Sequence, residues 1–79
     1  MIHTRQNVVG IRVREARTSA KTPLTQAGLS QKLGRLGVSI DRAAVAKIET
    51  GIRGVLDYEV IALATALGVK ASWLLNAED

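Results

Sequence analysis

The sequence predicts an all-α fold, one domain of five short helices, and three observations indicate it. Apolar side chains recur at intervals of three and four residues, which places them on one face of a helix. No stretch alternates apolar and polar residues over the length of a strand, and the sequence has no Asn-Gly or Asp-Gly pair to form a hairpin. With 79 residues, the chain is long enough for one domain. We expect residues 8–76 to form the folded core, residues 1–6 to be frayed and residues 77–79 to be a polar tail.

The first two helices are each expected from an apolar stripe and a boundary signal. The first is expected over Val8–Ala20, and its stripe consists of Val9, Val13, Ala16 and Ala20. The segment Lys21–Pro23 marks its end, because proline has no amide hydrogen and cannot continue a preceding helix. Thr25 is a good cap for the second helix, which carries Gln26, Leu29, Leu33 and Leu36 at helical spacing.

The remaining helices are expected from capping residues and glycines. Asp41 caps a third helix over Arg42–Thr50, which Gly51 ends. Asp57 is expected to cap a fourth helix, which Gly68 ends. The residues of the fourth helix expected to face inward are Val60, Ile61, Ala64 and Leu67, and a fifth short helix is expected over Ser72–Leu75.

Composition excludes several classes of protein. Apolar residues make up 47% of the chain and charged residues 23%, which is typical of a folded domain. The sequence has no cysteine and one histidine, so it offers no disulfide, thiolate metal site or cysteine nucleophile. Residues 1–6 are mostly polar, so we expect no signal peptide there, and the sequence has no apolar run of the roughly 18 residues that a membrane span needs. We expect a cytoplasmic protein without catalytic residues, metal, cofactor or small-molecule ligand.

Charge divides the chain into two halves. Residues 1–53 carry ten Lys and Arg against three Asp and Glu, a net charge of +7. Residues 54–79 carry one against four, a net charge of −3. A basic half beside an acidic one indicates a surface that binds a polyanion, with nucleic acid as the first candidate. Segregation of charge in an ordinary globular protein is the alternative.

Three segments resemble the phage-repressor/Cro-type (XRE) helix-turn-helix family. Leu24–Gly34 reads LTQAGLSQKLG and is similar to the family pattern L-[ST]-Q-x-x-L-A-x-x-L-G. Ile40–Gly51 is similar to the family's recognition helix, which ends I-x-x-[IL]-E-x-G. The closing segment of the domain is matched by Leu63–Val69 and Ser72–Leu75. The resemblance covers about residues 8–76 and implies a lambda-repressor-like five-helix domain that binds double-stranded DNA and regulates transcription.

The third helix has one apolar face and one face suited to a DNA groove. Stepping about 100° per residue places Val45 and Ile48 opposite Arg42. Small side chains beside Arg42 would let the helix approach base edges, where arginine can bind guanine and an alanine methyl can touch thymine. The alternative is an ordinary solvated helix face. The residues expected to face DNA are Arg42, Ala43, Ala46, Lys47 and Thr50.

The resemblance gives roles to four further residues. It implies that Gln26, at the start of the second helix, and Arg53, just past the third, contact the DNA backbone. A capping or merely exposed glutamine is the alternative for Gln26. It also implies that Glu49 pairs with Arg17 of the first helix as a structural ion pair.

The chain departs from the family pattern in three places. The turn between the second and third helices is lengthened by residues 35–39, or the second helix runs about one turn further, through Leu36. The connection at residues 18–23 is also longer than usual. Gly28 weakens the second helix by up to about 1 kcal/mol relative to alanine, and Ser30 stands where the family has a small alanine.

The C-terminal helix is the expected dimer interface. Trp73, Leu74 and Leu75 are consecutive, and three consecutive residues span about 200° of a helix, so they cannot all face one core. The resemblance implies a homodimer that presents two recognition helices to successive major grooves about 34 Å apart. A core role for Trp73 and Leu74 is the alternative. The competing function is a protein-interaction module, such as an antitoxin-like or accessory subunit with the same fold.

Overall fold

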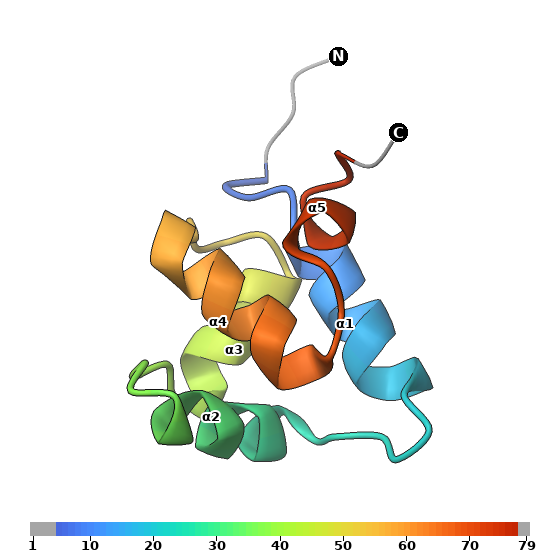
Figure 1. Ribbon diagram of the computed structural model, residues 1–79. Coiled ribbons are helices and arrows are strands. Elements are labelled where there is room, and N and C mark those ends of the chain that lie inside the picture. The colour runs from blue at the N-terminus through green and yellow to red at the C-terminus, as the bar shows by residue number, and fades with distance from the viewer. Residues whose placement is uncertain (1–4, 78–79) are drawn as a thin grey trace.

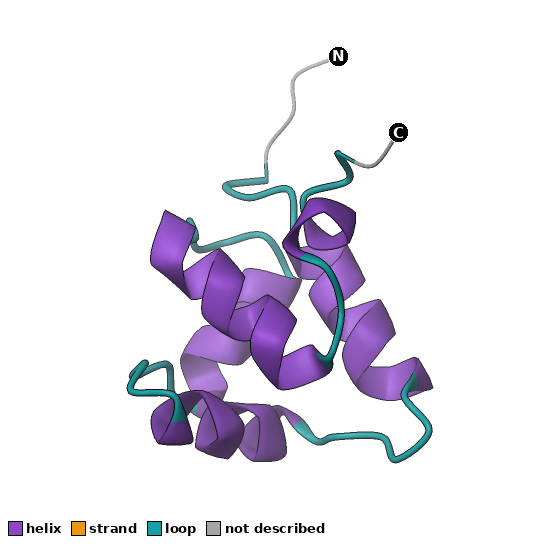
Figure 2. Ribbon diagram, viewed as in Figure 1, coloured by secondary structure: helices purple, strands orange, loops and turns teal. Residues whose placement is uncertain are grey.

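The computed structural model describes residues 5–77, which contain five helices and no strand (Figures 1 and 2). The all-α, five-helix prediction is therefore confirmed for this part of the chain. The helices are α1 (Gly10–Ser19), α2 (Gln26–Arg35), α3 (Arg42–Glu49), α4 (Asp57–Leu67) and α5 (Ala71–Leu74).

The helices pack around a small core to which all five contribute buried residues. α4 packs against α1, α2 and α5, while α3 packs against α1 and α2. Figure 1 shows α2 and α5 at opposite ends of the molecule. The largest fully buried side chains are Leu29, Leu33, Ile48, Leu63, Leu74, Val9, Val13 and Val45. None of the described helices is long and apolar enough to cross a membrane.

Two of the three predicted capping residues are confirmed, and the third is wrong. Thr25 Oγ1 accepts the amide hydrogen of Gly28 at 2.9 Å, and Asp41 Oδ1 accepts that of Ala44 at 2.8 Å. Asp57 instead lies inside α4 as its first residue. The residue before it, Leu56, donates its amide hydrogen to the carboxylate of Glu59 at 3.0 Å. The carboxylate of Glu59, in the first turn of the helix, therefore accepts an amide hydrogen at the helix start that Asp57 was expected to cap.

The lengthened connection between α2 and α3 is a compact helix-ending turn. Gly37 has a φ of 82°, a left-handed conformation that glycine adopts without steric cost. Its amide donates to the carbonyl of Gly34 at 3.0 Å, and the amide of Val38 donates to that of Leu33 at 2.9 Å. These two hydrogen bonds form a Schellman motif, which closes α2 just after Leu36. Of residues 35–39, only Arg35 lies within α2, and Leu36 is the cap after its last residue. The extra residues therefore form a lengthened turn, as the first interpretation of the sequence proposed, and do not add a full helical turn.

Ser30 ties this turn back to α2. Its hydroxyl donates a hydrogen bond of 2.7 Å to the carbonyl of Ile40, the residue before the cap of α3. Ile40 is itself buried, at 3% exposure. The departure from the family pattern at Ser30 therefore provides an anchor for the connection that leads into α3.

Ile61 and Leu74 do not lie on the sides of their helices that were expected. Ile61 was expected inside, yet it is 62% exposed, since it lies about 100° around the helix from the buried Val60. Ala62, Leu63 and Ala66 complete the buried face of α4 in its place. Leu74 was expected at a dimer interface, but it is fully buried within the monomer.

Candidate nucleic-acid interface

α3 presents a buried face to the domain and an open face to solvent. Val45 and Ile48 are fully buried, and Glu49 is 7% exposed. The residues expected to face DNA lie on the other side: Arg42, Ala43, Lys47 and Thr50 are exposed, and Ala46 is half-buried. The Thr50 hydroxyl donates to the carbonyl of Ala46 at 3.0 Å. The structure therefore gathers all five of these residues on one open surface.

A buried carboxylate holds α1, α2 and α3 together. Glu49 accepts two hydrogen bonds from Arg17, from Nε at 2.7 Å and from Nη2 at 2.9 Å. The side chains of Arg17 and Glu49 are only 11% and 3% exposed. Arg17 Nη1 also donates to the carbonyl of Leu24 at 2.9 Å, just before α2. The hydrogen bond to Glu49 raises the pKa of Arg17 above its usual value.

Gln26 belongs to the same network. Its Nε2 donates to Glu49 Oε1 at 3.1 Å, so the first residue of α2 is bonded to the last residue of α3. Gln26 remains half-buried at the N-terminal end of α2. Its amide is thus oriented by Glu49 rather than free in solvent.

Arg53 has a structural partner that the sequence did not indicate. Its Nη1 and Nη2 donate to the two carboxylate oxygens of Glu59 at 3.0 and 2.9 Å. The Glu59 side chain is 5% exposed, whereas that of Arg53 is 30% exposed. These hydrogen bonds lower the pKa of Glu59 and raise that of Arg53. The pair fixes the loop after α3 to the first turn of α4 and leaves part of the arginine open to solvent.

The segment before α1 is bonded to the end of α3, so the expectation that residues 1–6 are frayed is wrong for Arg5 and Gln6. Residues 1–4 lie outside the described part of the chain. Arg5 Nη2 donates to the carbonyl of Glu49 at 2.9 Å, and the Gln6 amide donates to that of Gly51 at 2.7 Å. Asn7 Nδ2 donates to the carbonyls of Ile48 at 3.0 Å and Arg53 at 2.8 Å.

α5 is held against α1 through one arginine. The guanidinium of Arg12 lies 4.7 Å from the centre of the Trp73 ring, and its Nη1 donates to the Trp73 carbonyl at 2.6 Å. Trp73 is half-buried against the core, and Leu75 is 42% exposed. Of the three residues expected at a dimer interface, Trp73 and Leu75 therefore keep exposed surface.

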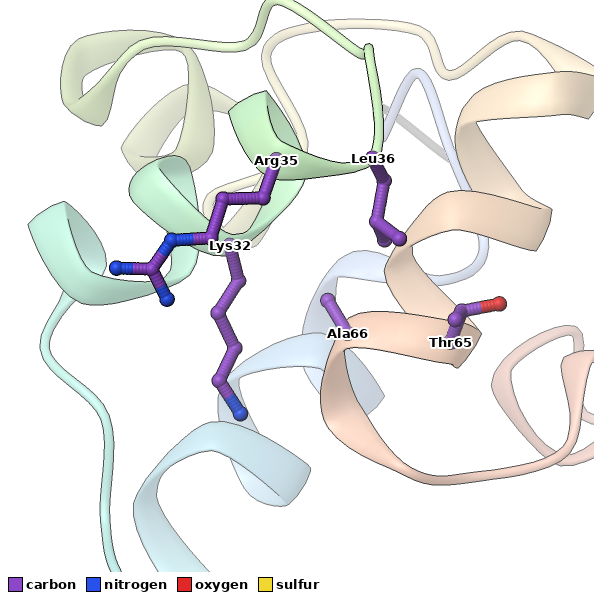
Figure 3. Close-up of a pocket in the computed structure, with 5 residues that line it drawn as sticks. All are labelled: Lys32, Arg35, Leu36, Thr65 and Ala66. Atoms are coloured by element: carbon purple, nitrogen blue, oxygen red, sulfur yellow. The ribbon is translucent and has the colours of Figure 1, made fainter.

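A cavity of about 230 Å³ lies on another part of the surface, between α2 and α4 (Figure 3). Its lining consists of Lys32, Arg35, Leu36, Thr65 and Ala66. None of these residues belongs to the set expected to contact DNA. Among the described residues, no group of three or more His, Cys, Asp or Glu side chains could hold a metal ion.

Five packed helices, with α2 and α3 joined as a helix-turn-helix, define a class of DNA-binding transcriptional regulators. The sequence matches the helix-turn-helix family model over residues 13–74, and the chain belongs to this family. The structure is similar to that of the P22 c2 repressor protein, solved in complex with a synthetic operator. The TM-score is 0.69 at 26% sequence identity, and the match covers 91% of this chain and 98% of the repressor chain. Among curated protein sequences, none matches the chain significantly.

Proposed function

We propose that the protein is a sequence-specific regulator that reads the major groove of double-stranded DNA with the outer face of α3. The observation that carries this proposal is the division of α3 into two faces. Val45 and Ile48 are fully buried and fix the helix to the domain. The opposite face offers two cations among small side chains, which suits close approach to base edges.

The residues of this face have different roles in the proposal. Arg42, in the first turn of α3, donates to a guanine edge, because a guanidinium can bind guanine O6 and N7 together. Lys47 binds a base or a phosphate. Ala43, Ala46 and Thr50 keep the helix close to the groove and offer methyl groups to thymine.

Gln26 and Arg53 contact phosphates on either side of the groove in this proposal. Each is oriented by a buried carboxylate, Gln26 by Glu49 and Arg53 by Glu59. Contacts to phosphate position a protein on DNA without carrying sequence information. Rigid placement of these two side chains therefore supports a fixed docking angle for α3.

The proposed active species is a cytoplasmic homodimer that has repressor-like action and no enzymatic activity. Trp73 on α5 is half-buried and Leu75 just after it is 42% exposed, so both keep apolar surface at this end of the molecule. Pairing of two copies there would present two α3 helices to successive major grooves about 34 Å apart. The dimer is two-fold symmetric, so the DNA site is an inverted repeat.

Selection of bound duplexes from a random pool tests the proposal. The selected duplex and a scrambled duplex are then compared by fluorescence anisotropy at two salt concentrations. We expect the selected sequence to bind at least about 1,000-fold more tightly than the scrambled one, as is typical of specific regulators. Equal affinity for both duplexes would contradict sequence-specific reading.

A protein-interaction module, such as an antitoxin-like or accessory subunit, is the second candidate function. The observation that favours it is the exposure of large aliphatic side chains: Ile11, Ile52 and Ile61 are 63%, 68% and 62% exposed. Absence of binding to any duplex at low salt would favour this function over DNA recognition.

A further inference from the structure

The last turn of α3 is completed by the N-terminal segment of the chain. The final four carbonyls of a helix have no partner within that helix. In α3, the carbonyls of Ala46 and Lys47 accept amide hydrogens from Thr50 and Ile52 at 3.0 and 2.9 Å. The carbonyl of Ile48 accepts the amide hydrogen of Gly51 at 3.1 Å and also a side-chain hydrogen from Asn7, while that of Glu49 accepts one from Arg5. Local backbone turns therefore supply partners for three of these carbonyls, and the distant segment supplies the partner of Glu49 and a second one for Ile48.

Asn7 is the centre of this arrangement. Its Nδ2 bridges the carbonyl of Ile48, inside α3, and the carbonyl of Arg53, in the loop that follows. Its Oδ1 accepts the amide hydrogen of Gly10 at 2.7 Å, at the start of α1. One side chain thus joins the beginning of α1, the end of α3 and the loop after it.

Arg5 adds a charge at the same place. Its guanidinium donates to the Glu49 carbonyl and lies across Gly51, whose added Cβ would meet Arg5 side-chain atoms at 2.8–2.9 Å. A cation at the C-terminal end of a helix is favoured by the helix dipole. The close fit leaves little room for the end of α3 to move relative to residues 5–7.

Resting on the proposed function, we propose that residues 5–7 form a brace that sets the docking angle of α3, with Asn7 as a positioning residue for DNA recognition. Asn7 does not touch DNA in this proposal. It acts by holding α3 in the orientation that binds the groove, because displacement of the helix lowers the fraction of molecules that are competent to bind.

Asn7→Ser is the decisive substitution. Serine keeps a side-chain oxygen that can cap the start of α1, but it is too short to bridge the Ile48 and Arg53 carbonyls. We expect an affinity for the selected duplex about fivefold to thirtyfold lower, with little change on the scrambled duplex. The dependence of affinity on salt should stay as in the wild type, because the substitution changes no charge.

Two further variants separate the brace from other effects. Gly68→Ala strains the left-handed residue after α4, at a φ of 69°, and serves as a control for general loss of stability. Arg5→Met tests for a direct phosphate contact, which would lower the slope of the salt dependence by about one ion. If the proposal is right, Arg5→Met leaves the slope of the salt dependence unchanged. Gly68→Ala likewise leaves the ratio of affinities for the selected and scrambled duplexes unchanged.

Hydrogen exchange on the free protein tests the brace without DNA. The amide of Ile52, bonded to Lys47 in the last turn of α3, should exchange faster in Asn7→Ser than in Gly68→Ala at equal folded fraction. Equal exchange, or unchanged discrimination by Asn7→Ser, would overturn the proposal. If the wild type fails to discriminate between duplexes, the proposed function fails, and the exchange measurement still decides whether the brace exists.

Discussion

Gln26 and Glu49 connect the first residue of α2 to the last residue of α3 by a hydrogen bond of 3.1 Å. Because Arg17 occupies the same carboxylate through two further hydrogen bonds, three helices meet at one buried charge. The relative orientation of α2 and α3 is thereby fixed at the end of α3 as well as at its connecting turn. The same network holds a side chain that we propose as a phosphate contact.

Loss of either member of the Arg17–Glu49 pair should strongly destabilise the protein. Arg17→Met leaves a buried carboxylate without its cation, and Glu49→Gln leaves a buried cation without its anion. We expect each to lower the free energy of unfolding by about 3–5 kcal/mol. The double variant should lose less than the sum, and urea unfolding of all four proteins measures the difference. Additive losses would show that the two residues do not interact.

Arg42→Ala should impair sequence reading rather than general affinity. We expect a loss of about 1–3 kcal/mol on the selected duplex and relaxed preference at one base pair. Arg35→Ala is the matched control, since it also removes one exposed arginine but lies on α2, beside the cavity in Figure 3. Anisotropy titrations on selected and scrambled duplexes measure both variants. A loss by Arg42→Ala that is equal on the two duplexes would remove its assignment as a base reader.

The sequence predicted well the features that depend on a few neighbouring residues. Thr25 and Asp41 cap helices through amides only three residues away, so residue type and position indicate them. Helical spacing likewise separated the buried Val45 and Ile48 from the exposed face of α3. The Arg17–Glu49 pair spans 32 residues, and only the family resemblance indicated it.

Contacts between distant segments could not be predicted from the pattern. Asn7 reads as one polar residue near a terminus, and its partners lie 41 and 46 residues away. The Arg53–Glu59 pair depends on the path of the loop between α3 and α4. Glu59, the third residue of α4, is at a position from which a carboxylate can cap a helix start. From the sequence, Asp57 was expected in that role instead.

The contribution of Glu59 to the free energy of unfolding should decrease as the pH is lowered. Hydrogen bonds from Arg53 hold the pKa of Glu59 below its usual value, so the folded state favours the ionised form. This contribution is complete above the unfolded-state pKa of about 4.3 and is lost as the pH falls through the lower pKa of the folded state. Glu59→Gln should therefore be less stable than the wild type at pH 7, by about 1–3 kcal/mol.

The difference between Glu59→Gln and the wild type should shrink as the pH is lowered below about 4. Urea unfolding at pH 7 and at several acidic values measures it. Asp57→Asn, which removes an exposed carboxylate from the same helix, provides the control and should change stability little. A difference for Glu59→Gln that stays constant with pH would contradict a role for its charge.

Substitution of Gly10 and of Gly34 by alanine should change the stability of the protein in opposite directions. A Cβ on Gly10 would overlap the backbone carbonyl oxygen of Ile48, so α1 and α3 would have to separate. We expect Gly10→Ala to cost about 1–3 kcal/mol or more. Gly34→Ala, inside α2 with no atom within 4 Å of the new Cβ, should instead stabilise by about 0.5–1 kcal/mol. Thermal unfolding measures both, and similar effects at the two sites would contradict the close approach at Gly10.

Leu75→Lys should weaken self-association while leaving the monomer folded. Leu75 is 42% exposed just after α5, so lysine there keeps its charge in water, whereas a lysine at the buried Leu74 would unfold the domain. Sedimentation equilibrium at tens of micromolar should give a dimer for the wild type and a monomer for Leu75→Lys. Ile61→Lys, at a similarly exposed position on α4, is the control and should remain dimeric. A monomeric wild type on its selected duplex would defeat the dimer proposal.

The stacking of Arg12 on Trp73 gives the domain an internal optical probe. Trp73 is the only tryptophan in the chain, and its ring lies between a guanidinium and the core. Indole emission responds to its immediate surroundings, which here are the contact between α1 and α5. Its signal therefore monitors the region of the proposed subunit contact, whereas a dye on the DNA monitors the surface of α3. Titrations that follow both the indole emission and the DNA dye would therefore distinguish self-association from DNA binding.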